Sequence, residues 1–129
     1  MSIDIPPIVN AIQEKDGTFT KLLEQGADPN TRFIGIPVLH LTISLHDFDS
    51  MRALLRYGAD INAVDSDGKS AIDYVFDERL GFAWIEYLIH NGIKIPDEEY
   101  WSKHVRQLTP DDVCFLSDHE IKLVNPKRL

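Results

Sequence analysis

The 129-residue sequence has one cysteine, Cys114, so it cannot form an intramolecular disulfide. Small secreted domains commonly depend on disulfides, so we expect a reducing compartment and a cytoplasmic location. The first residues contain neither a basic segment nor an apolar stretch, and a secretory signal requires both. No apolar run is long enough to cross a bilayer, so we expect no contact with a membrane.

Basic residues are also scarce: the sequence has 13 of them against 21 acidic residues, and the formal net charge is −8. Nucleic-acid binding relies on lysines and arginines that displace counterions, and this chain has no stripe of them. We therefore expect no nucleic-acid partner. Excess negative charge steers a protein towards basic partners with a salt-sensitive association rate, but it can equally serve only to maintain solubility.

Patterns that carry chemistry are missing as well. The five histidines and Cys114 show no metal-ligand spacing, and we find no phosphate-binding glycine loop, nucleophile elbow or zinc-protease motif. Residues 65–68 are similar to the start of a calcium loop, but the later ligands are absent, which favours a turn. Cys114 lies in an apolar run and is expected to be a small buried side chain. The sequence thus predicts no enzyme, no metal and no cofactor.

An internal repeat is the main feature that the sequence does contain. The segment Leu22–Asn30 recurs as Leu54–Asn62 and, more weakly, as Leu88–Ile95. The glycines of the three copies are 32 and 34 residues apart, a period typical of stacked supersecondary units. The length suits a single domain, which we place over residues 1–129.

Each copy is predicted to form a loop, a helix, a turn and a second helix. The apolar residues of 50–57 recur on one helical face, and Gly58 ends this helix because glycine adopts the left-handed conformation without strain. Residues 64–68 supply a hairpin-like loop. Ser70 is expected to cap the next helix, with Asp73 as its reciprocal partner.

The later helices are predicted over residues 72–76 and 82–91. The tail does not repeat clearly, but Asp97 and Thr109 each stand where a residue could cap a helix. We expect two further helices over residues 96–129, either as a C-terminal cap or as a degenerate fourth repeat. Residues 125–129 are expected to fray.

The order Gly-x-Thr-Pro-Leu-His, helical hairpin, Leu-Leu-x-x-Gly-Ala-Asp-x-Asn resembles the ankyrin repeat. Residues that match this pattern in the middle copy are Gly35, Leu39, His40, Leu54, Leu55, Gly58, Ala59, Asp60 and Asn62. The resemblance implies an all-α ankyrin-repeat solenoid with hairpin-like loops. It comprises about three helix-turn-helix units (3–32, 33–64 and 65–95) and a C-terminal helical cap (96–129). It also gives His40 a structural role, in which the ring bonds the neighbouring hairpin loop.

By the same resemblance, hairpin tips and first helices line a concave groove that binds another protein. On the tips the resemblance places Arg32, Phe33, Ile34, Ser66, Asp67 and Lys69, and along the inner helices Leu41, Ser44, Leu45, Tyr74, Asp77 and Glu78. Phe33 either anchors a partner or folds back onto the core. Trp84 is expected in the core, and Trp101 either in the core of the cap or on a contact surface.

Two kinds of binding function fit these features. The first is a free-standing, monomeric protein that binds and blocks a basic partner, as an inhibitor or immunity protein would. Short bacterial ankyrin proteins that occur beside secreted toxins suggest this reading by resemblance. The alternative is an ankyrin effector delivered into a host, or an intracellular adaptor.

Overall fold

The computed structural model describes residues 5–13 and 17–123. The expectations for the first four residues and for fraying at residues 125–129 lie outside these ranges. The chain divides into two compact units at residues 80 and 81, which we describe separately as the N-terminal unit and the C-terminal unit. The expected third repeat (65–95) crosses this boundary, so a single domain over residues 1–129 stays a prediction.

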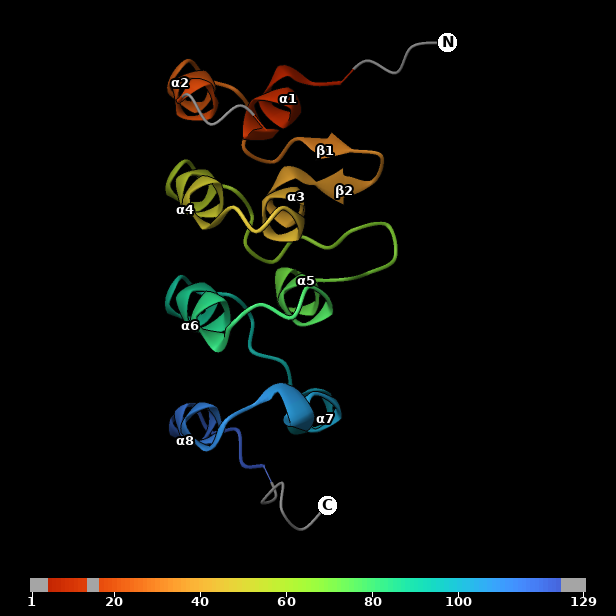
Figure 1. Ribbon diagram of the computed structural model, residues 1–129, viewed down its shortest axis with the longest axis vertical. Helices are drawn as coiled ribbons and strands as arrows, with labels where there is room; N and C mark the ends of the chain where they lie inside the picture. The colour runs from red at the N-terminus through yellow and green to blue at the C-terminus, as the bar shows by residue number, and fades with distance from the viewer. Residues whose placement is uncertain (1–4, 14–16, 124–129) are drawn as a thin grey trace. The chain divides into compact units, whose positions relative to one another are not determined.

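The N-terminal unit is built from helical pairs and one short hairpin. Its elements are α1 (Pro7–Gln13), α2 (Thr18–Glu24), β1 (Arg32–Phe33), β2 (Ile36–Pro37), α3 (Val38–Ser44), α4 (Phe48–Arg56) and α5 (Ala71–Asp77). Helix α1 packs against α2 and α3 against α4, and contacts between α2 and α4 and between α3 and α5 join successive repeats. Within this unit α1, α3 and α5 form one row, and the hairpin projects from the side of that row away from α2 and α4 (Figure 1).

Glycine ends the second helix of each repeat copy, as the sequence predicts. Gly26 and Gly58 have φ angles of 98° and 95°, and the residue after each donates its N–H to a carbonyl five residues back. This left-handed turn satisfies carbonyls that the helix end leaves without partners. Gly92 adopts the same conformation in the C-terminal unit, with φ of 93°.

The core of the N-terminal unit lies between the helices of successive repeats. Its most deeply buried apolar side chains, each at most 1% exposed, are Val38, Leu39, Ile43, Met51, Leu54, Ala71, Ile72 and Val75. The repeats are also tied by a polar contact, since Asn30 Oδ1 accepts a hydrogen bond of 2.6 Å from Asp60 N. The apolar positions that recur in the sequence thus form a core that continues from one repeat to the next.

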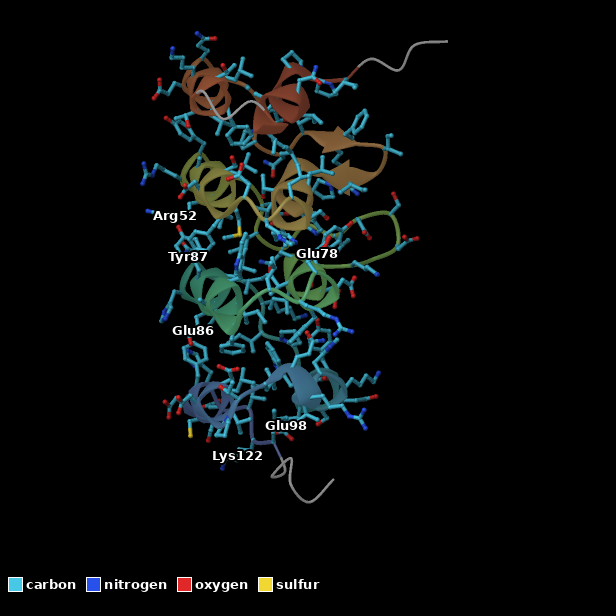
Figure 2. The ribbon with its side chains drawn as sticks, in the orientation of Figure 1. Arg52, Glu78, Glu86, Tyr87, Glu98 and Lys122 are labelled. Atoms are coloured by element: carbon cyan, nitrogen blue, oxygen red, sulfur yellow. The ribbon has the colours of Figure 1, made fainter. Side chains whose placement is uncertain are left out.

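The C-terminal unit contains α6 (Phe82–His90), α7 (Glu98–Lys103), the 3₁₀ helix η1 (Val105–Gln107) and α8 (Pro110–Asp118). Both predicted caps are confirmed: Asp97 accepts from Tyr100 N, and Thr109 forms a capping box with Asp112. After α8, Lys122 N donates to Glu98 Oε1 on α7 over 3.2 Å (Figure 2).

The C-terminal unit also decides or corrects three predictions about single side chains. Trp101 is fully buried and its indole N–H donates to Pro96 O, so it belongs to the core of the cap. Trp84 is only half-buried, because the inward face of α6 is occupied by Ile85 and its neighbours one turn on. The expectation that Cys114 is buried is wrong: it is exposed, since Leu116 takes the buried side of α8.

Candidate protein-binding groove

The candidate binding site, which we call the groove, begins at two adjacent loop tips, one from each of two successive repeats. In the β1–β2 hairpin, Arg32 pairs with Pro37 and Phe33 with Ile36. The residues between the strands, Ile34 and Gly35, have φ angles of 53° and 75°, and positive φ at both central residues is the pattern of a type I′ turn. The turn therefore holds Ile34 outward, where the residue is 70% exposed.

Hydrogen bonds hold the second tip against the first. Gly35 O accepts from Ser66 N over 3.1 Å, from Ser66 Oγ over 3.2 Å and from Arg32 Nη2 over 2.9 Å. A Cβ atom at Gly35 would clash with Ser66 Oγ, so any other residue would have to displace this hydroxyl and also adopt a positive φ, which favours glycine. The two tips thus form a connected rim.

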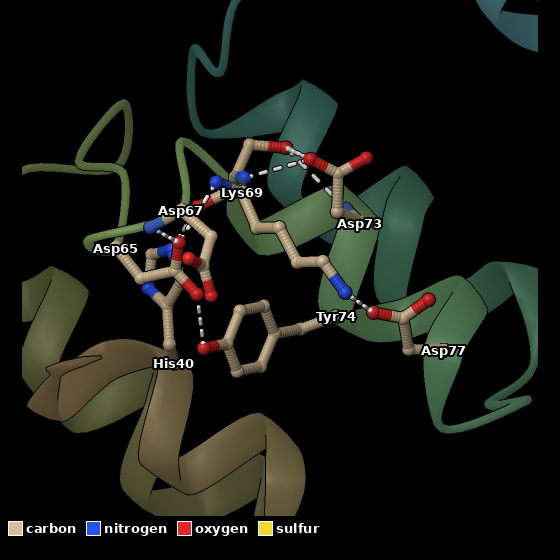
Figure 3. Close-up of polar contacts among 8 residues, drawn as sticks. His40, Asp65, Asp67, Lys69, Asp73, Tyr74 and Asp77 are labelled. Atoms are coloured by element: carbon tan, nitrogen blue, oxygen red, sulfur yellow. Dashed lines mark hydrogen bonds and ion pairs between the residues drawn. The ribbon is translucent and has the colours of Figure 1, made fainter.

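Asp65 organises the second tip from inside (Figure 3). Its Oδ1 accepts from the N–H groups of Asp67 and Lys69, both at 2.9 Å, and its Oδ2 accepts from Tyr74 Oη at 2.6 Å. The hydrogen bond from Tyr74, helped by the backbone N–H groups, outweighs burial and lowers the pKa of Asp65. Burial and the Asp65 carboxylate raise the pKa of Tyr74. Residues 65–68 are therefore a turn, as predicted.

His40 supports the same loop from α3. The side chain is fully buried, Nε2 lies 3.1 Å from Lys69 O, and the ring meets Tyr74 edge-on at 4.7 Å between centroids. Because a carbonyl only accepts, Nε2 carries the proton in this contact. Burial lowers the pKa of His40, although the bond to Lys69 O opposes this effect. The predicted structural role of His40 is what the geometry provides.

Only one ring nitrogen of His40 is satisfied. Its Nδ1 is buried without a hydrogen-bond partner among the described residues. Pro37 stands at the threonine position of the ankyrin pattern, at the N-cap of α3, and provides no side-chain capping bond. A proline offers neither a hydroxyl nor an N–H, so it cannot serve His40 or the helix end.

One ion pair and one histidine–carboxylate contact lie at the C-terminal end of α5. Lys69 Nζ is 2.8 Å from Asp77 Oδ2, and this contact raises the pKa of Lys69. His46 Nε2 is 3.6 Å from Glu78 Oε2. The carboxylate of Asp67 has no cationic partner among the described residues, and Asp67 is exposed. The end of the groove is therefore acidic.

These parts enclose an open pocket of about 350 Å³. Its lining is Ile34, Ile36, Ser44, Asp65, Ser66, Asp67, Lys69, Tyr74, Asp77 and Glu78. Eight of these are among the twelve residues predicted from the sequence. The structure thus gathers most of the predicted tip and inner-helix positions around one pocket.

Four predicted residues do not line the pocket. They are Arg32, Phe33, Leu41 and Leu45. Phe33 is half-buried in β1, so the exposed apolar residue of the tip is Ile34 and not the aromatic. Leu41 is half-buried, and Leu45 is 49% exposed at the C-cap of α3.

The prediction missed two lining residues, Ile36 and Asp65. Ile36 could have been found from the hairpin, because it pairs directly with Phe33 across the strands. The sequence identifies Asp65 only as a turn residue. Its second role depends on Tyr74 nine residues later, and local pattern does not show that contact.

The pocket is chemically suited to binding a cationic group. Four carboxylates face a single ammonium, and Ile34 with Ile36 adds an apolar wall. Within residues 5–13 and 17–123, no group of three or more His, Cys, Asp or Glu side chains is placed to hold a metal ion. None of the described helices combines the length and hydropathy that crossing a bilayer requires.

Residues 35–66 match the family model described as Ankyrin repeat. The match runs from the turn glycine of the hairpin, through α3 and α4, to the tip serine that bonds it. Ankyrin repeats bind other proteins and are typically not enzymes. This matched copy and the repeating helical pairs together make an all-α ankyrin-repeat solenoid, which supports a role as a protein–protein interaction module.

Proposed function

We propose that this protein binds a basic partner protein through the pocket and its two loop tips and thereby blocks the partner's activity. One observation carries the proposal: a pocket with four carboxylates and one ammonium lies directly beside an isoleucine that is 70% exposed. Acidic groups attract and orient a basic surface, while an exposed apolar side chain gains free energy only when a partner covers it. We further propose that the protein acts as a monomer in the cytoplasm.

Hydrogen bonds within the chain order the rim without the help of a partner. Three hydrogen bonds converge on Gly35 O, and three more converge on the Asp65 carboxylate. A surface that is already ordered loses little conformational entropy on binding. Such preorganisation suits a tight inhibitor of immunity type better than a loose adaptor.

Capture from an extract of the source organism tests the binding surface. The test variant is Asp67→Lys in the groove, and the control is Glu24→Lys, which makes the same charge change at the exposed C-terminal end of α2. A lysine is favourable at a helix C-terminus, so the control should stay folded. We expect wild type and control to retain one basic protein and Asp67→Lys to lose at least tenfold in affinity. Equal retention by both variants would overturn the groove assignment.

The blocking role needs a separate measurement. The captured partner's own activity, or its toxicity when expressed alone, is assayed with and without a stoichiometric amount of this protein. Inhibition that Asp67→Lys weakens supports an inhibitor or immunity protein. A partner that stays fully active in the complex indicates an adaptor or a host-directed effector instead.

A further inference from the structure

We infer that the pocket receives an arginine side chain of the partner, and that Lys69 is an internal cation which this arginine displaces from Asp77. The inference rests on the proposed function and names the chemistry by which the same site recognises its partner. It is carried by the ion pair already present in the pocket, by the carboxylate of Asp67 in the same lining and by the apolar side chains of Ile34 and Ile36.

The pocket already binds one cationic group of the chain itself. Lys69 Nζ lies 2.8 Å from Asp77 Oδ2, and both side chains are about half exposed (Figure 3). The Lys69 side chain therefore occupies, from within the loop, a position that a cation of the partner could take. Exposed ion pairs contribute little to stability, so separating Lys69 from Asp77 requires little free energy.

The acceptors left for an incoming group are clear from the hydrogen bonds. Both oxygens of Asp65 are committed to donors of the loop and of Tyr74. Among the described residues, Asp67 forms no ion pair within 4.0 Å, and the Glu78 carboxylate contacts His46 at 3.6 Å. With Asp77 freed from Lys69, three carboxylates remain to accept hydrogen bonds from a guest.

Arginine fits these acceptors better than lysine. Its planar guanidinium offers five donors, sheds water more readily than an ammonium and can bond more than one carboxylate at once. Its apolar stem can lie along Ile34 and Ile36, as long cationic side chains do on apolar surfaces. A pocket of about 350 Å³ has room for one such side chain.

The test is a titration of the ¹⁵N-labelled full chain, followed by NMR, with the peptide acetyl-Gly-Arg-Gly-amide. Its twin carries citrulline in place of arginine, which keeps the shape and removes the charge. We expect the arginine peptide to shift the amides of Ser66, Asp67 and Glu78. The citrulline peptide should bind at least tenfold more weakly, and a lysine peptide about threefold more weakly.

Two variants test the role assigned to Lys69 and to the acceptors. Lys69→Met removes the internal cation but keeps the backbone groups that bond His40 and Asp65. It should tighten arginine-peptide binding about threefold to tenfold, whereas Asp67→Asn/Glu78→Gln should weaken it about tenfold. A thermal melt of each variant near that of wild type shows that the fold is intact.

Three results would overturn the inference: equal binding of arginine and citrulline peptides, amide shifts outside the pocket, or no gain in Lys69→Met. These results are distinct from a failure of the proposed function. If the peptide test fails while Asp67→Lys still abolishes capture of the partner, the groove stands and only the arginine assignment falls. If Asp67→Lys does not affect capture, the binding surface itself lies elsewhere.

Discussion

Among single residues, Asp65 and Asp67 differ sharply in what they stabilise, although they are two positions apart. The Asp65 carboxylate accepts three hydrogen bonds, whereas that of Asp67 is exposed and accepts none among the described residues. We expect Asp65→Asn to lower the free energy of unfolding by about 2 kcal/mol, because hydrogen bonds to a charged group are the strong ones. Asp67→Asn, with the same change of charge, should stay within about 0.5 kcal/mol of wild type. Urea denaturation measures both, and equal losses would contradict this account.

His40 and Asp65 make stability depend on pH in the same direction. The pKa of each is lower in the folded chain than in the unfolded one, whose values are near 6.5 and 3.8. The unfolded state therefore binds more protons on acidification, and stability falls with it. The His40 contribution is lost as pH falls below about 6.5, and that of Asp65 below about 4.

Urea denaturation of wild type between pH 8 and 5 should thus show a falling free energy of unfolding. In His40→Gln the slope between pH 7 and 5 should flatten, since glutamine does not titrate. Wild-type stability that rises on acidification over this range, or an unchanged slope in the variant, would show that the buried imidazole does not govern the pH dependence.

At the scale of elements, the contact between the two loop tips can be tested through glycine. Gly35 and Gly58 both have positive φ, but only at Gly35 would a Cβ strike another side chain, that of Ser66. Gly58→Ala should lose about 1 kcal/mol from backbone strain alone, and Gly35→Ala about 2 kcal/mol or more. The double variant Gly35→Ala/Ser66→Gly removes the clash and should recover part of the difference. No recovery, measured by urea denaturation, would show that the tips are not coupled.

Helix boundaries and caps could be predicted from the sequence because they are local. Ser70 with Asp73, and Thr109 with Asp112, each lie three residues apart, and the structure forms both capping boxes. The glycine that recurs after the second helix of each copy is local in the same sense, and it predicts that these segments are helices.

Burial and the pocket were harder to predict, for a physical reason. A short apolar run does not fix which side of a helix turns inward, so the run around Cys114 predicts a buried side chain where the structure has an exposed one. The rim depends on a contact between Gly35 and Ser66, 31 residues apart, and Asp65 acquires its buried role only through Tyr74. Such contacts arise when repeats stack. The repeat period predicts that they stack, but it does not predict which residues then touch.

On the scale of the molecule, the distribution of charge is more informative about partner binding than the net charge of −8. A charge that serves only solubility need not gather anywhere. Here four carboxylates line one pocket with a single ammonium, beside exposed Ile34. Fields from such a site reach about 8 Å at physiological ionic strength, which is enough to orient a partner as it arrives.

The repeat architecture also predicts how stability is distributed along the N-terminal unit. Helices α3 and α4 pack against each other and against neighbours on both sides, α5 on one and α2 on the other. Helices α1 and α2 have their main contacts with each other and with α4. Repeat arrays lose terminal units first, because each unit is held only by its neighbours. Native-state hydrogen exchange should therefore show α3 and α4 as the slowest amides of this unit, with α1 and α2 exchanging at least tenfold faster. Equal protection across all four helices would mean that the N-terminal unit opens in a single cooperative step.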